Sequence, residues 1–406
     1  MSDKIKKLIG QEDSFGAGQE LRLILQGAVR QALREVVQEE VSGLCGQPYK
    51  PTDNGEYFRA GSAPSSVYVQ GKRERMPRPR VRQRTAQGVQ EVVLQSWKAA
   101  QDPAQWEDSV MRAVLCGVSS RDVACLSAEE ALGQSKASVS RLWQKKASVL
   151  VEEVQQSDLL GFDLLVLMVD AVVLGKNLVA TVALGINTRG YKKVLGFRIG
   201  GSENKEVCKD LLSNLQRRGL QKKPGRRLLA VLDGSEALRG AVMAHYPDTL
   251  VQRCLVHKER NVRGYLSKRH WAELAALFKK LRQGQGEKEA EAAAEALRAF
   301  LKDKNAQARE SFEEAGEDLL RLFELNVPNT LHRTLLSTNC IENVFKNLRR
   351  HIGRVCRWHR ETDQADRWMA SGLKLAETGF RRIVGHGDLE KLKQALEKSE
   401  ANRQAA

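Results

Sequence analysis

Two aspartates each follow a run of apolar residues that is long enough for a buried β-strand. Asp170 follows the apolar run 164–169, and Asp233 follows the apolar run 228–232 of a predicted strand that starts at Arg226. A carboxylate in such a place is costly unless it emerges at the carboxyl-terminal edge of a sheet, which is where α/β proteins assemble their sites. Two such aspartates on neighbouring strands form the hard-oxygen donor set that Mg²⁺ and Mn²⁺ prefer.

The chemistry that this pair predicts is phosphodiester transfer. Two metal ions roughly 3.5–4 Å apart can activate a water or a 3′-hydroxyl and also stabilise the leaving oxygen. The alternative is that each aspartate is only a turn residue at the end of its strand, and Asp233-Gly234 is itself a turn dipeptide.

A third carboxylate, Glu342, lies in the polar and basic segment 337–350. Asn339 is placed to cap a helix there, with Glu342 in its first turn, and this pattern is close to a capping box. Lys346, Arg349 and Arg350 follow at one-turn spacing and favour a phosphate beside the carboxylate. The residues alone leave a structural and a catalytic role open for Glu342.

The bulk composition favours a polyanionic partner. The 406 residues include 66 Lys and Arg against 50 Asp and Glu, for a net charge of +16, and the isoelectric point is near 9.6. Such a charge attracts nucleic acid, because neutralising phosphates releases condensed counterions. The alternative is a soluble protein that is merely basic.

Cysteine usage and hydropathy predict a protein of the cytoplasm, associated with the nucleoid. The seven cysteines are scattered and include no CxxC pair, so a disulfide framework is not expected. The first residues lack the apolar core of a signal peptide, and the most apolar stretch, 164–174, is too short to span a bilayer, so no membrane partner is expected.

The elements around these residues change character along the chain. We predict an N-terminal helical segment over 1–45, either core-packed or dimerising, and a basic extended arm over 46–90, where two prolines exclude a helix. The arm suits a DNA backbone or minor groove, although a solvated linker would have a similar composition. Its candidate DNA-binding residues are Arg73, Arg75, Arg78, Arg80 and Arg82.

The segment 91–155 has the pattern of a helix-turn-helix region. A helix with Val110 and Val114 is followed by a glycine, a serine-capped second helix and a third helix from residue 135 onward. Ser138, Arg141 and Lys145 share one side of this third helix and are candidate DNA contacts. Small three-helix units without DNA affinity are common, so this remains one of two interpretations.

From residue 156 the periodicity predicts an α/β domain with a mixed sheet: three strands, a helix, a strand, a helix and a strand. Its first part covers 156–263, an all-α insertion rich in Ala, Glu and Lys covers 264–335, and its second part, which carries Glu342, covers 336–385 with a helix that runs from Asn339 toward residue 380. A C-terminal helix and tail follow over 386–406.

Four segments resemble the Mutator-type transposases of bacterial insertion sequences: 167–171, 231–238, 252–261 and 337–343. In that family a ribonuclease-H-like domain holds an Asp-Asp-Glu triad, with a helical insertion before the Glu. The resemblance implies that Asp170, Asp233 and Glu342 are the catalytic and metal-binding residues. It covers roughly residues 105–385, whereas the N-terminal third is similar only in general layout.

The resemblance also bears on Cys254 and His257, an isolated CxxH pair. As zinc ligands the two lack partners at a recognisable spacing, and a packed helix-start cysteine beside a hydrogen-bonded histidine is an alternative. The family carries a similar pair after its second Asp, which implies that His257, Lys258 and Arg260 lie beside the active site and contact DNA. Cys254 and Asn339 would then help to shape the site.

The expected protein is therefore an α/β, ribonuclease-H-like enzyme preceded by a helical DNA-binding region. It would bind the terminal inverted repeats of an insertion sequence, cleave with two Mg²⁺ or Mn²⁺ ions, and join the 3′-hydroxyl ends to target DNA, as a homodimer that brings two ends together. Two other hypotheses are a ribonuclease-H-like nuclease or resolvase, and a helix-turn-helix regulator that binds DNA without cutting it.

Overall fold

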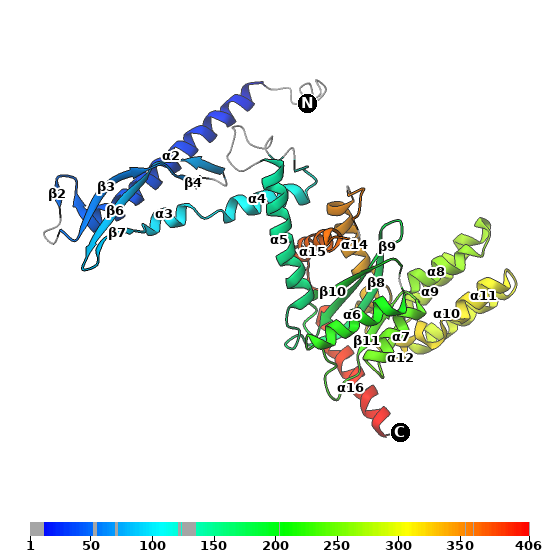
Figure 1. Cartoon of the computed structure of the whole chain (residues 1–406). Helices are drawn as coiled ribbons and strands as arrows, with labels where there is room; N and C mark the ends of the chain where they lie inside the picture. Colours follow the sequence, from blue (N-terminus) through cyan, green and yellow to red (C-terminus); the bar gives the residue numbers. More distant parts are fainter. Residues whose placement is uncertain are drawn as a thin grey trace. The chain divides into compact units, whose positions relative to one another are not determined.

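The computed structural model (Figure 1) describes residues 12–51, 55–69, 72–120, 123, 135–202, 204–353, 355–359 and 361–405. The chain divides into two compact units, Met1–Lys145 and Lys146–Ala406, which are treated separately below. Within the described ranges, no helix combines the length and the apolar character needed to cross a bilayer.

The first unit begins with one long helix, α2, which agrees with the predicted N-terminal helical segment. The buried face of α2 carries Val37, Val41 and Cys45, which pack against Val81 and Trp97. The elements after α2 (Glu12–Cys45) are β1 (Gly46–Gln47), β2 (Lys50–Pro51), β3 (Tyr57–Ala63), β4 (Ser66–Val69), β5 (Lys72–Arg75), β6 (Arg78–Thr85), β7 (Gly88–Val92), α3 (Gln95–Ala100) and α4 (Ala104–Leu115).

The described residues of 46–90 are extended and include no helix, as expected of the basic extended arm, but they are folded into paired strands. They form antiparallel strands, in a β3-β6-β7 sheet and a β4-β5 hairpin. Val67, Val69 and Val81 alternate with polar residues and are fully buried, so pairing these strands covers an apolar face and satisfies the backbone. Pro79 is tolerated because it stands beside the register shift of β3 between Arg59 and Ser62.

The helix-turn-helix prediction is only partly covered by the described residues. Val110 and Val114 are buried on α4, as expected. The predicted second helix falls on 121–134, of which only Val123 lies within the described residues. The third is α5 (Lys136–Gln156), which starts after Ser135, whose hydroxyl accepts a hydrogen bond from the Ser138 amide.

The second unit is built on a five-stranded mixed sheet, as the sequence predicts. Its strand order is β10-β9-β8-β11-β12, with antiparallel pairing from β10 to β8 and parallel pairing from β8 to β12. The elements are β8 (Leu164–Gly175), β9 (Leu178–Asn187), β10 (Lys192–Gly200), α6 (Lys205–Arg217), β11 (Leu229–Leu232), α7 (Glu236–His245) and β12 (Leu250–Arg253).

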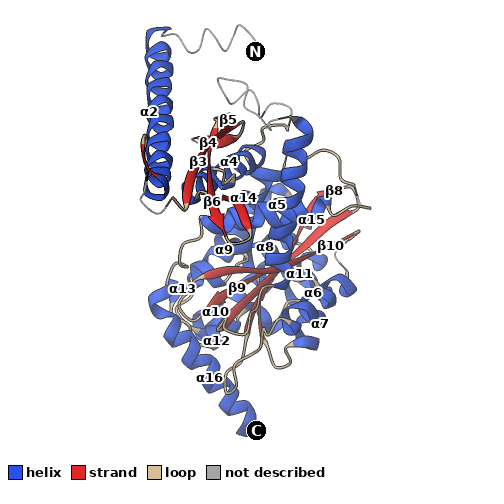
Figure 2. Cartoon of the chain, turned by 60° about the vertical axis from the view of Figure 1, so that its left-hand side comes forward, coloured by secondary structure: helices blue, strands red, loops and turns tan. Residues whose placement is uncertain are grey.

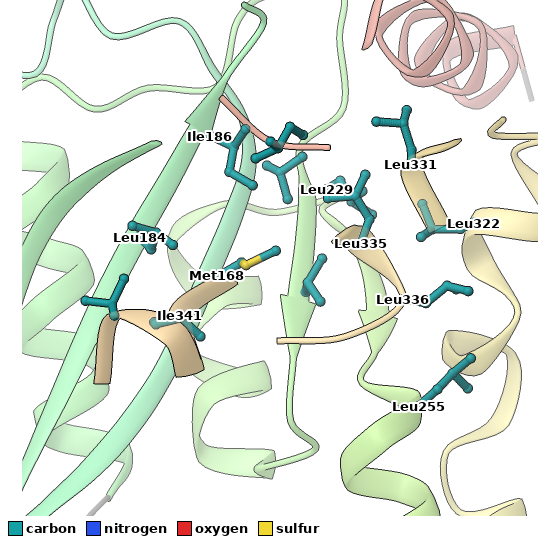
Figure 3. Close-up of a cluster of buried hydrophobic side chains, with 14 of the residues drawn as sticks. Met168, Leu184, Ile186, Leu229, Leu255, Leu322, Leu331, Leu335, Leu336 and Ile341 are labelled. Atoms are coloured by element: carbon teal, nitrogen blue, oxygen red, sulfur yellow. The ribbon is translucent and has the colours of Figure 1, made fainter. Parts of the chain in front are cut away.

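Helices cover both faces of this sheet, so its strands are apolar on both sides. Figure 2 shows α6 and α7 on one side of the red strands and α10, α12 and α13 on the other. Along β8, Leu167 and Val169 face α6 and α7, whereas Met168 belongs to the larger core of the opposite face. Figure 3 shows that core, in which Met168 and Leu184 lie near Ile341.

The segment after β12 is helical throughout, in agreement with the predicted insertion. Figure 1 shows α8 to α11 extending together to one side of the sheet. The elements are α8 (Leu255–Gly264), η2 (Lys268–His270), α9 (Trp271–Gln283), α10 (Glu287–Lys302), α11 (Ala306–Glu313), η3 (Gly316–Leu319), α12 (Arg321–Glu324) and α13 (Asn329–Leu335).

The predicted helix does start at Asn339, but the prediction that it continues toward residue 380 is wrong. The chain forms α14 (Asn339–Ile352) and α15 (Gln364–Thr378), followed by η4 (His386–Asp388) and α16 (Leu389–Ala405). Ile352 is the last buried residue of α14, and Gly353 ends the helix. The Trp358 indole then donates a hydrogen bond to the Leu174 carbonyl, which holds the intervening segment against the end of β8.

Candidate active site

The strand register sets Asp170 and Asp233 beside each other. Val169 of β8 pairs with Leu232 of β11, so the residues that follow each of them occupy adjacent positions. Asp170 does not end its strand as predicted, because β8 continues to Gly175 by pairing with β9. Since β11 stops at Leu232, the side of Asp170 that β11 would have covered is left open to the site.

Asp170 is 7% exposed, and its Oδ1 accepts a 2.7 Å hydrogen bond from the Ala171 amide. Burial raises the pKa of Asp170 to about 7, and the negative charges of Asp233 and Glu342 contribute to this rise. The hydrogen bond from the Ala171 amide and the charge of His257 act in the opposite direction and lower the pKa. The carboxylates of Asp233 and Glu342 are therefore near enough to Asp170 to influence its charge.

Asp233 also has the turn role that the sequence left open. Its Oδ1 accepts a 2.9 Å hydrogen bond from the Ser235 amide, and the Ser235 hydroxyl caps α7, as predicted, by accepting from the Leu238 amide. One carboxylate oxygen thus fixes the turn, and the structural and catalytic interpretations of Asp233 are compatible.

Glu342 stands in the first turn of α14, but the expected capping arrangement is absent from this helix. The N-cap is Thr338 rather than Asn339, and Thr338 makes no side-chain capping bond. The Thr338 hydroxyl lies 3.2 Å from Glu342 Oε1, and His257 Nε2 lies 3.4 Å from the same oxygen. The Glu342 carboxylate is therefore held toward α8 and is not used to cap its own helix.

Cys254 and His257 form the other half of this network. Cys254 is fully buried at the N-terminus of α8, where its Sγ accepts hydrogen bonds from the amides of His257 and Thr338. His257 Nδ1 lies 3.3 Å from the Thr338 hydroxyl. The hydrogen bond with Cys254 raises the pKa of His257, and Asp170 and Glu342 raise it further, although burial opposes them. The pair links α8 to α14 beside the carboxylates.

Lys258 was predicted to contact DNA, and the structure contradicts this. The Lys258 side chain is 2% exposed, and its ammonium lies 2.6 Å from Oε2 of Glu314. Glu314 stands in the link between α11 and η3. Arg253, at the end of β12, binds the same carboxylate through two nitrogens at 3.0 and 3.1 Å. Lys258 follows His257 by one residue and so points away from the carboxylates, toward the helical insertion.

An open cleft of about 780 Å³ includes Asp170, His257 and Glu342 in its lining. Asn339 lines it, as do three of the predicted DNA-binding residues, Arg260, Lys346 and Arg349, whereas Arg350 is exposed outside this lining. Three further cations of the lining had not been singled out in the sequence: Lys192, Arg333 and Arg382. No local spacing points to them, because they come from three distant segments.

The carboxylates fit a divalent cation by donor chemistry. The negative charges of two hard-oxygen groups, Asp233 and Glu342, raise the pKa of a third, Asp170, and a cation beside them would offset that cost. In their present rotamers, no three His, Cys, Asp or Glu side chains of the described residues lie close enough together to hold a metal ion. Binding therefore requires a rearrangement of side chains.

In the first unit, the predicted DNA-binding residues differ in how far they are already engaged. Arg78 and Arg80 share Glu91 at 2.6 and 2.7 Å, and Arg73 donates to the Ser66 hydroxyl at 2.9 Å. Arg75 is exposed and Arg82 is half-buried. On α5, Arg141 and Lys145 are exposed, Ser138 is half-buried, and Val139, Leu142 and Trp143 are buried, which confirms the predicted sides of this helix.

Comparison with known proteins accounts for most of the chain. The family model described as transposase, Mutator family, matches residues 3–370. A transposase for insertion sequence element IS905 from Lactococcus lactis is 32% identical over 169 residues, 42% of this chain and 41% of that protein. A transposase for insertion sequence element IST2 from Acidithiobacillus ferrooxidans is 26% identical over 213 residues, which are 52% of this chain and 69% of that protein. A transposase for insertion sequence element IS1201 from Lactobacillus helveticus is 30% identical over 175 residues, which are 42% of this chain and 45% of that protein.

These alignments span about two fifths to two thirds of the relatives' own lengths, whereas the family model extends over both units. The chain belongs to the Mutator family of transposases.

Proposed function

We propose that this chain is a transposase that binds the ends of an insertion sequence, cleaves the DNA by metal-dependent phosphodiester hydrolysis, and joins the 3′-hydroxyl ends to target DNA. The observation that carries the proposal is the register match of Asp170 and Asp233 beside a cleft that Glu342 and several cations line. The mixed sheet, with a helical insertion before Glu342, is what a ribonuclease-H-like domain of this family requires.

Asp170, Asp233 and Glu342 would hold one or two Mg²⁺ or Mn²⁺ ions. When bound, the ions supply an activated water or 3′-hydroxyl and stabilise the leaving oxygen. His257 and Thr338 hold the Glu342 carboxylate in place until then. Arg260, Lys346 and Arg349 line the cleft and would neutralise the phosphates of the strand being cut.

DNA recognition is proposed for the first unit and the start of α5. Arg141 and Lys145 are exposed on one side of α5, with Ser138 half-buried near its start, which suits a recognition helix. Arg73, Arg75 and Arg82 of β5 and β6 would contact the backbone, joined by Arg78 and Arg80. Because two ends are brought together, we expect a homodimer that acts on double-stranded DNA at the nucleoid, in the cytoplasm.

The test is strand cleavage of DNA that carries the element's ends, in Mg²⁺ or Mn²⁺, by the wild type, Asp233→Asn and Glu342→Gln. We expect both variants to lose at least about 10³-fold in rate, because each removes a ligand of the ion that stabilises the transition state. Asp210→Asn, which alters an exposed carboxylate of α6, is the matched control and should cleave normally.

Cleavage that persists in the two variants would rule out the carboxylate site. A wild type that binds the ends but cuts with neither metal would favour a regulator. Ends that are cut and never joined to a second DNA would favour a nuclease or resolvase.

A further inference from the structure

A cluster of cations and aromatic rings adjoins the cleft, which Lys192 and Arg382 help to line. Tyr191 is 51% exposed, and the guanidinium carbons of Arg189 and Arg382 lie 5.8 and 5.4 Å from the centre of its ring. The Lys192 ammonium lies 5.1 Å from the centre of the Phe380 ring. We call Arg189, Tyr191, Lys192 and Arg382 the rim cluster.

The rim cluster is held by a fixed scaffold. The turn before β10 is closed by Asn187, whose Oδ1 accepts from the amides of Arg189 and Tyr191. The carbonyl of Gly190, a residue with φ of 82°, accepts a 3.0 Å hydrogen bond from the Ile383 amide, and Arg382 Nε donates to the Arg189 carbonyl at 2.8 Å. The cations are therefore positioned before any ligand arrives.

The cluster lacks neutralising anions. In the described part of the chain, no carboxylate forms an ion pair with Arg189, Lys192 or Arg382, nor with the neighbouring Arg333. By contrast, the exposed arginines Arg298 and Arg309 of the insertion pair with glutamates of their own helices. Like charges gathered around one ring repel each other, and a bound polyanion relieves that repulsion.

The cluster is continuous with the candidate active site. Lys192, Arg333 and Arg382 line the same cleft as Asp170 and Glu342. Lys192 of β10 pairs with Ile186 of β9, which in turn pairs with Val166 of β8. Val166 precedes Asp170 by four residues on β8, and β10 lies two strands away from β8. The strand spacings place it roughly 15 Å from Asp170, about four or five base steps of DNA, so one molecule of DNA can reach both.

We propose that the rim cluster is a binding site for the phosphodiester backbone of DNA, engaged several nucleotides away from the phosphate at the carboxylates. Arg189 and Arg382 contact phosphate oxygens as bidentate donors, and the Tyr191 ring, which both guanidinium groups approach, holds them near each other. This site rests on the proposed DNA-binding function and adds a contact that orients the strand along the cleft.

The test is the salt dependence of binding by the full-length protein to a short labelled duplex of mixed sequence, between about 50 and 200 mM NaCl. Arg189→Gln with Arg382→Gln should lower the slope of log affinity against log salt by about two and weaken binding about tenfold or more at the lowest salt. Arg382→Lys keeps the charge and should retain the slope. The matched control is Arg298→Gln with Arg309→Gln, which removes the same charge and should leave the slope unchanged.

An unchanged slope for the first pair, with a thermal melt like that of the wild type, would overturn the proposal, as would an equal fall in the control pair. Binding is measured without metal, so cleavage does not enter the result. If the salt slope falls as expected in Arg189→Gln with Arg382→Gln but the wild type cuts no DNA, the rim cluster is supported as a DNA-backbone site. The same result would contradict the proposed cleavage and joining of DNA.

Discussion

At the scale of single residues, Asp170 shows how a buried carboxylate, here a proposed catalytic residue, lowers the stability of the fold. The carboxylate is almost fully buried, and its folded pKa of about 7 lies above the ordinary value of 3.8. The contribution of Asp170 to the free energy of unfolding is greatest below pH 3.8, where the carboxyl is protonated in both states. This contribution is lost as the pH rises through 7, because the unfolded chain favours the charged carboxylate and the folded chain favours the neutral acid. At pH 8 the buried charge therefore lowers the free energy of unfolding.

We predict that Asp170→Asn raises the free energy of unfolding at pH 8, in the absence of metal, by roughly 1–3 kcal/mol. The same variant should lose the rise in melting temperature that Mn²⁺ produces in the wild type. Urea titrations and thermal melts with and without Mn²⁺ measure both effects. A variant less stable than the wild type without metal would contradict the argument from burial.

His332 on α13 carries a pH dependence of the opposite sign. It is 5% exposed, packs against Phe323, and its Nε2 bonds with the Val327 carbonyl. Burial lowers the pKa of His332 below 6.5, although the Val327 bond opposes this, so its stabilisation is present above pH 6.5 and is lost as the pH falls.

We therefore expect His332→Gln to flatten the fall in the free energy of unfolding between pH 7.5 and pH 5.5, because glutamine can keep the hydrogen bond and does not titrate. Urea titrations at the two pH values measure this. Equal falls in both proteins would show that other groups cause the acid sensitivity. His245→Gln, on α7, serves as a control at a less buried histidine.

At the scale of elements, the helical insertion is bound to the end of the five-stranded sheet close to Asp233. Glu314 binds both Arg253 and Lys258, whose side chains are 7% and 2% exposed. The Arg253 guanidinium also lies against Gly234, where φ is 119° and an added Cβ would stand 2.3 Å from Arg253 Nη2. The insertion thus supports the turn that follows Asp233.

We predict that Glu314→Gln lowers the free energy of unfolding by about 2 kcal/mol, because it leaves two buried cations without their anion. The adjacent Glu313→Gln is the matched control: its Arg309 partner is exposed, and the loss should stay below about 1 kcal/mol. Urea titrations of both variants measure these losses in the free energy of unfolding. Equal losses would mean that the contacts of Glu314 with Arg253 and Lys258 stabilise the fold no more than an exposed ion pair does.

At the scale of the whole molecule, the net charge of +16 predicts DNA binding that weakens steeply with salt. The cations of the first unit should not contribute equally. Arg78 and Arg80 already share Glu91, whereas Arg141 and Lys145 are exposed on α5. An arginine that must leave a carboxylate releases fewer counterions when it binds a phosphate.

We expect Arg141→Gln with Lys145→Gln to lower the slope of log affinity against log salt by about two, and Arg78→Gln with Arg80→Gln to lower it by about one or less. Fluorescence anisotropy with one duplex measures both. A larger fall for the second pair would place the main backbone contact on β6.

The periodicity of the second unit predicted most of its elements, because strands buried on both faces and amphipathic helices carry strong local patterns. The apolar runs became β8 and β11, and Ser235 capped α7. The strands of the first unit did not follow from the sequence pattern, because apolar residues are few in 46–90. The charged residues and prolines of this segment obscured the alternation of Val67, Val69 and Val81 with polar residues. One helix was expected where Gly353 separates two.

By itself, the sequence determined that Asp170 belongs to a buried apolar segment, that Asp233 follows a buried strand, and that the chain is basic, because these are properties of local composition. Only the tertiary structure decided which side chains meet: it turned Lys258 into the insertion, set Glu342 against His257, and brought Lys192, Arg333 and Arg382 to one cleft. Those contacts join residues far apart in the chain, and they depend on register and helix rotation, which no local pattern encodes.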